Sequence, residues 1–386
     1  MSVKKLPKIL YISDVPVELS SAGATLIYRL LEYYPKDKLQ IVQGVSVIKN
    51  QPRIPGVSYH ISKSPIERLR YTRFAKYSKG LFLTSGLIEL GKLKKIINDY
   101  KPDVILTVGF RLMWINAFRL SKQFKIPLYV ILHDDWLTTE NYGKWQNYLV
   151  GLFGKMYKHA AERFCISPAM EKYYHSLYGM NGKILYPSRG KNDPVFPVIS
   201  KKNKGLKFCY AGSLFTGDFP SMLNEISSAI AEQGGELHIF SHLDKEELSQ
   251  YEYLTKSHVF FYGLLHPLEL MRIMNESMDV AILLNSFLHE EPFRYNFSSK
   301  LVDYSSAGLP VLFWGPLSSG TISWALSLEY KAVVSEQNLT QVTELIREFK
   351  NDELRIYCAK QIQKWGISQF SYESNYNIFT RQKPFE

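Results

Sequence analysis

FSSKLVDYSSAGLPV, residues 297–311, is the stretch that says most about the fold of this chain. Ser298 and Ser299 are predicted N-caps, because a serine hydroxyl accepts a hydrogen bond from the free amides of a first helical turn. Gly308 is the predicted helix stop, and the apolar run 309–313 predicts a buried strand. The stretch therefore predicts a polar turn, an amphipathic helix and a strand, as in an α/β protein.

The amino end of this predicted helix combines three features that suit a nucleotide sugar. Free backbone amides favour an anion, Lys300 adds positive charge, and Asp303 places a carboxylate one turn further on. Together they can hold a diphosphate beside a ribose diol. An ordinary capped turn between a helix and a strand is the alternative, because short motifs of this kind also occur by chance.

Size and composition indicate a soluble protein with two domains. A chain of 386 residues exceeds one compact core, and 46% hydrophobic with 22% charged residues is typical of globular proteins. The three cysteines, Cys165, Cys209 and Cys358, lack metal-site spacing, which favours a reducing compartment over a disulfide framework. The amino terminus has no signal-peptide pattern, and no apolar run reaches the length of a membrane span. We expect a cytoplasmic protein.

Charge is divided unevenly along the chain. Residues 1–200 hold 30 Lys and Arg against 14 Asp and Glu, whereas residues 201–386 hold 17 against 22. The excess is densest in 63–101, where aromatic residues are interleaved, and this pattern suits an anionic membrane surface. No nucleic-acid-binding motif is present, so we expect no nucleic-acid partner. A solvated basic face without any partner is the alternative. The basic residues are Lys63, Arg68, Arg70, Arg73, Lys76, Lys79, Lys92, Lys94, Lys95 and Lys101.

Short apolar runs alternate with helical patterns in both halves of the chain, which predicts parallel, doubly wound sheets. The Pro-, Gly- and Lys-rich segment around 187–205 reads as a boundary. We expect a first domain at 1–190, a linker at 191–205 and a second domain at 206–365. The predicted strands are 8–13, 40–45, 103–108, 127–132, 164–167, 207–211, 236–240, 259–262, 280–284 and 310–314.

The segment 299–311 resembles the donor-site signature of family 4-like glycosyltransferases of the GT-B fold (glycosyltransferase group 1), with Asp303 in place of the usual Glu. Five further segments resemble family motifs in the expected order. They are 22–24, 132–134, 161–167, 210–214 and 261–265. The resemblance implies two Rossmann-like domains facing a central cleft, with a tail at 366–386 that crosses back to the first domain.

The resemblance also implies the roles of individual residues. His133, at a strand end beside the cleft, would contact the donor sugar or the scissile oxygen, although a structural pair with Asp134 is the alternative. Lys300 would stabilise the leaving diphosphate. Asp14 or Glu18, after the first strand, is a candidate base if the enzyme inverts configuration. The expected donor-binding residues are Gly23, Gly212, Ser213, Gly263, Leu264, Leu265, Ser298, Ser299, Lys300 and Asp303. For the glycines, plain turns are the alternative.

Two departures from the family pattern stand out. The stretch 215–219 lacks the basic residue that usually clamps the diphosphate, so Lys300 acts alone or with Arg189 or Lys191. Tyr295 stands where the family often has a Glu that contacts the donor sugar, and Glu290 and Glu291 are nearby substitutes or merely solvated. We expect no catalytic metal, because the neighbouring Asp134 and Asp135 lack the Asp-x-Asp spacing.

The expected function is glycosyl transfer from a nucleotide sugar to a glycan or lipid-linked acceptor hydroxyl. The donor would be a UDP- or GDP-sugar, used as substrate, with no cofactor and with retention of the anomeric configuration. Two alternatives remain open. One is a GT-B nucleotide-sugar 2-epimerase, and the other is a non-catalytic scaffold of polysaccharide assembly, which the two missing residues make credible.

Overall fold

The computed structural model describes residues 6–44, 52–61, 90–136, 142–201, 205–214, 217–242, 251 and 256–380. The chain forms two compact units. The first comprises Met1–Tyr186 and Tyr376–Glu386, and the second comprises Pro187–Asn375. The segment expected as a linker, 191–205, thus belongs to the second unit. The chain returns to the first unit at Tyr376, later than the expected 366.

The first unit is built on a seven-stranded parallel sheet in the order β3-β2-β1-β4-β5-β6-β7. Strands β1, β4 and β5 are buried at every position, which is why their sequences are continuous apolar runs. The exposed edge strand β3 was not predicted. The strands are β1 (Ile9–Ser13), β2 (Leu39–Gln43), β3 (Ser58–Ile61), β4 (Val104–Val108), β5 (Leu128–Leu132), β6 (Glu162–Cys165) and β7 (Lys183–Ile184).

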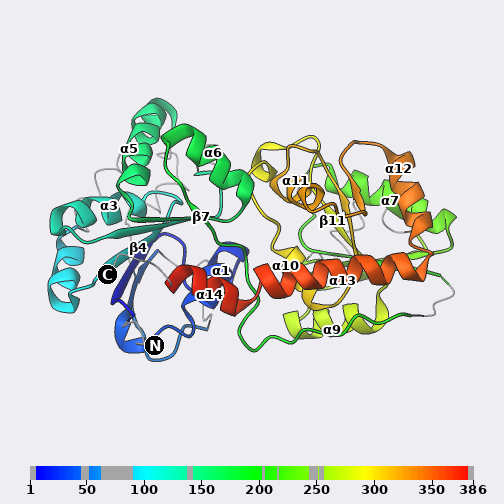
Figure 1. The fold of residues 1–386 in the computed structure, drawn as a ribbon, viewed down its shortest axis with the longest axis horizontal. Helices are drawn as coiled ribbons and strands as arrows, with labels where there is room; N and C mark the ends of the chain where they lie inside the picture. Colours follow the sequence, from blue (N-terminus) through cyan, green and yellow to red (C-terminus); the bar gives the residue numbers. More distant parts are fainter. Residues whose placement is uncertain are drawn as a thin grey trace. The chain divides into compact units, whose positions relative to one another are not determined.

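Helices flank this sheet on both faces (Figure 1), with α3, α5 and α6 on one face and α1 and α14 on the other. Residues 90–100 are also helical. No described helix combines the length and apolarity needed to cross a membrane. The elements are α1 (Ala22–Leu31), η1 (Lys36–Lys38), α3 (Met113–Phe124), η3 (Gly143–Trp145), α5 (Gln146–His159), α6 (Pro168–Tyr178) and α14 (Tyr372–Thr380).

The second unit contains a six-stranded parallel sheet in the order β10-β9-β8-β11-β12-β13. Five of its six strands were predicted within a residue of their ends, because they are short β-rich runs between polar turns. The strands are β8 (Lys207–Ala211), β9 (Glu236–Phe240), β10 (Val259–Tyr262), β11 (Val280–Leu284), β12 (Val311–Trp314) and β13 (Val333–Val334).

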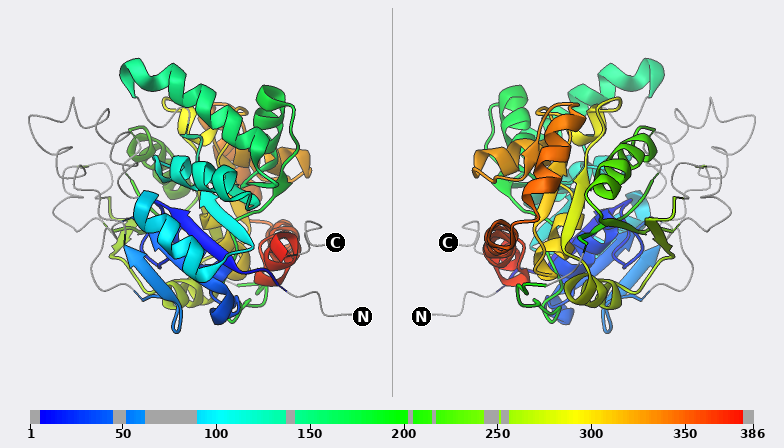
Figure 2. Two further views of the ribbon diagram at one scale, coloured as in Figure 1. Left: turned by 90° about the vertical axis from the view of Figure 1, so that its left-hand side faces the viewer. Right: turned by 90° about the vertical axis from the view of Figure 1, so that its right-hand side faces the viewer.

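Helices of the second unit pack on this sheet and on one another, and Figure 2 shows two further views of these elements. The long helix α13 packs against α10, where Gly366 leaves room for Ser305. The elements are α7 (Phe219–Glu232), α9 (Pro267–Ser277), η5 (Glu291–Phe293), α10 (Lys300–Ser306), α11 (Gly320–Ser327), α12 (Leu339–Glu348) and α13 (Asp352–Gln369).

The carboxyl end of α14 completes the core of the first unit. Phe379 is buried, and its ring lies 5.5 Å from that of Phe164 and 6.5 Å from those of Tyr34 and Tyr129, measured between centroids. These apolar contacts explain why the last described turn belongs to the first unit rather than the second.

Both sheets share one topology, which is that of a Rossmann-like doubly wound domain. In each, the strand order reverses beside the first strand, between β1 and β4 and between β8 and β11. Ligands of such sheets bind at this switch point, beyond the carboxyl ends of the strands. The predicted fold class of two doubly wound α/β domains is confirmed.

The stretch 297–311 folds as predicted with one correction. Gly308 has φ +69° after the helix α10, and a side chain there would clash with the Pro197 carbonyl oxygen, 2.9 Å from a Cβ. The predicted serine cap was wrong, because the Ser299 side chain makes no capping bond and its backbone is already helical. The helix α10 begins at Lys300.

Candidate active site

Gly212 and Lys300 meet at the switch point of the second sheet. Gly212 directly follows β8 and has φ +144°, a conformation that favours glycine. A Cβ at this position would overlap the Lys300 Cε and would lie 2.7 Å from the ammonium nitrogen. The absence of a side chain at 212 therefore makes room for the lysine, which the sequence could not show.

The ammonium of Lys300 lies among aromatic rings rather than beside a carboxylate. It donates a hydrogen bond to the Tyr210 hydroxyl at 2.7 Å, and it lies 4.2 Å from the Tyr210 ring centroid and 5.7 Å from that of Phe219. Burial lowers the pKa of Lys300 to about 7. Within the described part of the chain no acidic group forms an ion pair with it.

Helix α10 holds this lysine in place through Tyr304. The buried Tyr304 hydroxyl donates to the Ile282 carbonyl at 3.1 Å and accepts from the Ala211 amide at 3.0 Å. These bonds tie the helix to β8 and β11 at the switch point. The position of Lys300 is therefore set by two strands distant in sequence.

The amino end of α10 offers fewer free amides than expected. The Ser298 amide donates to the Thr321 hydroxyl at 3.0 Å, and the amides of Leu301 and Val302 bond to carbonyls of the preceding turn. The amides of Ser299 and Lys300 have no partner among the residues that the structure describes. Two amides and the Lys300 ammonium are thus the groups available to an anion here.

The other expected donor-binding residues lie at the same edge of the second sheet. Asp303 is half-buried in the first turn of α10, and the Ser213 carbonyl accepts from the Tyr210 hydroxyl at 2.7 Å. Gly263, Leu264 and Leu265 follow β10, with Leu264 82% exposed. The strand order places β10 two strands away from β8.

In the first unit the structure brings Gly23 and His133 together. A Cβ at position 23 would lie 2.8 Å from the His133 Nε2, so only glycine fits in this packing. His133 follows β5 and is 8% exposed, and its Nε2 lies 3.2 Å from an Asp134 carboxylate oxygen. Its Nδ1 is buried without a hydrogen-bond partner among the described residues.

Asp14 follows β1 at the switch point of the first sheet, and its carboxylate binds the start of α3. One carboxylate oxygen accepts from the amides of Leu112 and Met113, at 2.9 and 2.7 Å, at the start of α3. A carboxylate at a helix amino end is stabilised by the helix dipole and by these charge-assisted bonds. This geometry favours a structural role for Asp14 over that of a base.

Comparison with known proteins identifies similarities in sequence and in fold. Residues 45–187 match the family model described as Glycosyltransferase Family 4. The solved structure of a glycosyltransferase from Rickettsia africae is 11% identical, covers 97% of this chain and 95% of that one, and has a TM-score of 0.66. The chain thus has the GT-B fold, and its residues 45–187 are similar to Glycosyltransferase Family 4.

Two further solved structures share the fold of this chain. The lipopolysaccharide outer core galactosyltransferase WaaB is 12% identical, with 96% and 97% of the two chains covered and a TM-score of 0.62. An E. coli trehalose-6-phosphate protein bound with UDP-2-fluoro glucose is 10% identical, with 96% and 97% covered and a TM-score of 0.66. No curated protein matches this chain in sequence.

Asp218 is a buried carboxylate between β8 and α7 whose role the sequence did not reveal. It is 5% exposed and precedes α7, and one carboxylate oxygen accepts from the amides of Phe287 and Leu288 at 2.8 and 3.1 Å. Its other oxygen has no partner among the described residues. Asp218 thus fixes the loop after β11. It lies within 215–219, the stretch that lacks the basic residue usual in the family.

The cations that were expected to assist Lys300 are differently placed. Arg189 and Lys191 belong to the second unit rather than the first, which corrects the expectation. Burial lowers the pKa of Arg189, while Glu373 and Asp193 raise it, and Lys191 lies 5.9 Å from the Tyr372 ring centroid. Neither shows a contact with Lys300.

Glu290 is the better placed of the two carboxylates that were expected to substitute for the missing Glu. It follows β11 and accepts a hydrogen bond from the Ser318 hydroxyl at 2.6 Å. Glu291 is exposed and begins η5. Of the two carboxylates, Glu290 is therefore the one held by a hydrogen bond in the described structure.

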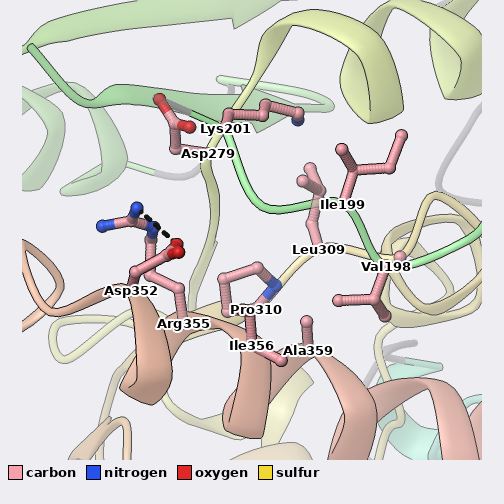
Figure 3. Close-up of a pocket in the computed structure, with 11 residues that line it drawn as sticks. Val198, Ile199, Lys201, Asp279, Leu309, Pro310, Asp352, Arg355, Ile356 and Ala359 are labelled. Atoms are coloured by element: carbon pink, nitrogen blue, oxygen red, sulfur yellow. Dashed lines mark hydrogen bonds and ion pairs between the residues drawn. The ribbon is translucent and has the colours of Figure 1, made fainter. Parts of the chain in front are cut away.

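Figure 3 shows a small pocket at the opposite, amino-terminal edge of the second sheet. Lys201 donates to the carbonyls of Met274 and Met278 at the end of α9. Arg355 donates to the Phe349 carbonyl and lies 2.8 Å from Asp352. Both cations are satisfied by helix carbonyl ends, so this pocket supports the fold rather than a substrate.

Most of the basic stretch 63–101 lies outside the described residues. Only 90–101 is described, and there Lys92, Lys95 and Lys101 are exposed on or after a helical segment, whereas Lys94 is half-buried. A search of the described residues finds no group of His, Cys, Asp and Glu arranged to hold a metal.

Proposed function

We propose that the chain transfers a sugar from a nucleoside diphosphate sugar to an acceptor hydroxyl. The observation that carries the proposal is the buried Lys300 ammonium, packed on Gly212 at the switch point without an acidic partner. A desolvated cation is unstable unless an anion balances it. The leaving diphosphate is that anion.

The donor would lie across the carboxyl edge of the second sheet. Its diphosphate would accept bonds from the Ser299 and Lys300 amides and from the Lys300 ammonium, and Asp303 would accept from the ribose hydroxyls. Fixed amides and a fixed cation stabilise charge that develops on the leaving group without reorganising as the bond breaks. This is the main catalytic contribution that we assign to the second unit.

We also propose a role in transfer for His133 of the first unit. Its buried, unpartnered Nδ1 and the close packing on Gly23 hold the imidazole in one place. Asp14 is engaged by the start of α3. We propose retention of configuration by same-face attack, assisted by the leaving phosphate. The acceptor would be a glycan or a lipid-linked glycan, and transfer would need no metal.

Titration calorimetry with UDP, GDP, ADP and dTDP tests the donor proposal. Free Lys300, with a pKa of about 7, is mostly neutral at pH 8. Bound phosphate raises that pKa, so binding at pH 8 should take up about 0.9 proton, measured from the enthalpy in buffers of different ionisation heat. The double variant Lys300→Met, Asp303→Ala should bind none of these four nucleotides. Unchanged affinity in that variant would refute the proposal.

Product analysis tests the remaining claims. Proton NMR of the product should show the anomeric configuration of the donor, and transfer should persist in EDTA. A β-linked product from an α-linked donor would remove the retaining mechanism. Epimerised nucleotide sugar formed without acceptor would replace transfer by epimerisation.

A further inference from the structure

The outer face of α5 exposes aromatic and basic side chains together. We define this α5 face as Lys144, Trp145, Tyr148, Lys155 and Lys158. Trp145 is 37% exposed and Tyr148 is 54% exposed, and the three lysines are exposed as well. Positions 148, 155 and 158 lie on one side of the helix, and 144 and 145 lie in the 3-10 turn that leads into it.

The opposite side of α5 explains why this face is held outward. Leu149, Phe153, Met156 and Tyr157 are fully buried, and Gly154 lets the helix approach the Tyr178 ring of α6. Figure 1 and the left view of Figure 2 show α5 at the outer margin of the first unit. The α5 face is therefore a fixed surface of a packed helix.

The two aromatic residues form an exposed pair with a lysine beside them. The Trp145 and Tyr148 rings meet edge to face with centroids 6.4 Å apart, and the Lys144 ammonium lies 5.8 Å from the Trp145 ring. Tryptophan and tyrosine combine an apolar ring with a polar group, so they prefer the headgroup level of a membrane over water.

The charge of this segment has one sign. Residues 142–161 contain three lysines and no Asp or Glu, and the next acid, Glu162, pairs with Lys183 at 2.9 Å. An ordinary solvated helix face mixes lysine with glutamate at i, i+4 spacing, which is missing here. Positive charge beside interfacial aromatics complements an anionic lipid surface.

We propose that the α5 face docks the protein on an anionic lipid bilayer. Trp145 and Tyr148 would insert at the headgroup level, and the three lysines would contact lipid phosphates. Each lysine near such a surface strengthens binding about fivefold, so three give a reversible attachment. This surface differs from the basic stretch 63–101. It also does not depend on the nucleotide site, which lies in the other unit.

Vesicle flotation of the full chain tests the proposal. Wild type should float with phosphatidylglycerol–phosphatidylcholine vesicles at low salt and remain unbound with phosphatidylcholine alone. The triple variant Lys144→Glu, Lys155→Glu, Lys158→Glu should lose binding at least about 100-fold. The double variant Trp145→Ala, Tyr148→Ala should lose about tenfold at any salt concentration.

Two matched controls separate this surface from others. The triple variant Lys92→Glu, Lys95→Glu, Lys101→Glu carries the same charge change on exposed lysines of the basic stretch. The double variant Tyr357→Ala, Ile367→Ala removes two residues of α13 that are 45% and 52% exposed. Both should float as wild type does. Calorimetric nucleotide binding by every variant checks that the second unit is intact.

The outcomes decide between alternatives. Selective loss in the two α5-face variants supports the proposal. If the triple variant that includes Lys92 loses flotation while both α5-face variants keep it, the proposal is overturned and the basic stretch is favoured. Absence of flotation by wild type, equal flotation on neutral vesicles, or binding to an RNA oligonucleotide without flotation also overturns it. None of these results bears on donor binding, which calorimetry measures separately.

Discussion

Replacing Lys300 with methionine should stabilise the free protein while abolishing nucleotide binding. Methionine fills a similar volume between Tyr210, Phe219 and Gly212 without carrying a charge. Burial lowers the pKa of Lys300 from 10.5 to about 7. One pKa unit corresponds to about 1.4 kcal/mol, so holding this ammonium charged costs the folded state at most about 5 kcal/mol.

The gain should be smaller than this limit and should depend on pH. The substitution forfeits the Tyr210 hydrogen bond and the ring contacts, about 1–2 kcal/mol together, and water near the half-buried side chain lowers the cost further. We expect a net gain of about 2 kcal/mol at pH 7, or about 4–8 °C in the Tm of a domain of this size.

The sign of the pH dependence follows from proton binding. Between pH 7 and 10.5 the folded state of the wild type binds fewer protons than the unfolded chain, so its stability rises with pH. The cost of Lys300 is complete below pH 7 and fades toward pH 10.5. The advantage of the methionine variant should therefore shrink with pH and be absent or reversed at the upper end.

Thermal unfolding followed by circular dichroism at pH 6, 7, 9 and 10 measures this difference. Lys331→Met is the matched control, because the exposed Lys331 also lies over a tyrosine ring, 4.9 Å from the Tyr357 centroid. Its effect should be small and independent of pH. A Lys300→Met variant that loses stability equally at pH 7 and pH 10 would refute the assignment of a desolvated ammonium.

Three other substitutions probe the site. Gly212→Ala should lower stability by about 2–4 kcal/mol in urea unfolding and abolish nucleotide binding, since a methyl group overlaps Lys300 and φ +144° disfavours alanine. Gly23→Ala should displace the His133 ring and lower kcat at least tenfold while calorimetric nucleotide affinity stays within twofold. Asp14→Asn should lower stability by about 1 kcal/mol but keep activity within threefold, whereas a 1,000-fold loss in kcat would show that Asp14 is a base.

The sequence was sufficient for the architecture because the strands are buried on both faces. Runs such as VILTV and LYVIL have no polar alternation, and only a covered parallel sheet accommodates them. The edge strand β3, with the sequence SYHI, was missed because it is exposed and lacks a continuous apolar run. Helices α6, α11, α12 and α13 were also not anticipated. The sequences of α11 and α13 carry little helical periodicity, whereas α12 is clearly amphipathic and its pattern was overlooked.

The sequence predicted which residues form the candidate site, but it did not predict the surroundings of their side chains. Gly212 and Lys300 were both expected, yet nothing in their spacing shows that one makes room for the other across about 90 positions of sequence. The aromatic surroundings that lower the pKa of Lys300 come from β8 and the start of α7. The serine cap failed because Ser299 already has helical backbone angles, which turn its hydroxyl away from the amides.

The missing second cation and the low pKa of Lys300 together determine the charge of the free site. Asp218 lies in the stretch where a cation was expected, and its carboxylate accepts from the loop after β11. Among the described residues, no cation is recorded in contact with Lys300. Near pH 7 the free site therefore holds about half a proton on Lys300 and little net charge. A diphosphate that brings its own negative charge completes the ion pair and draws in the remaining proton. Discrimination between a charged donor and a neutral sugar thus arises on binding rather than from a permanently charged pocket.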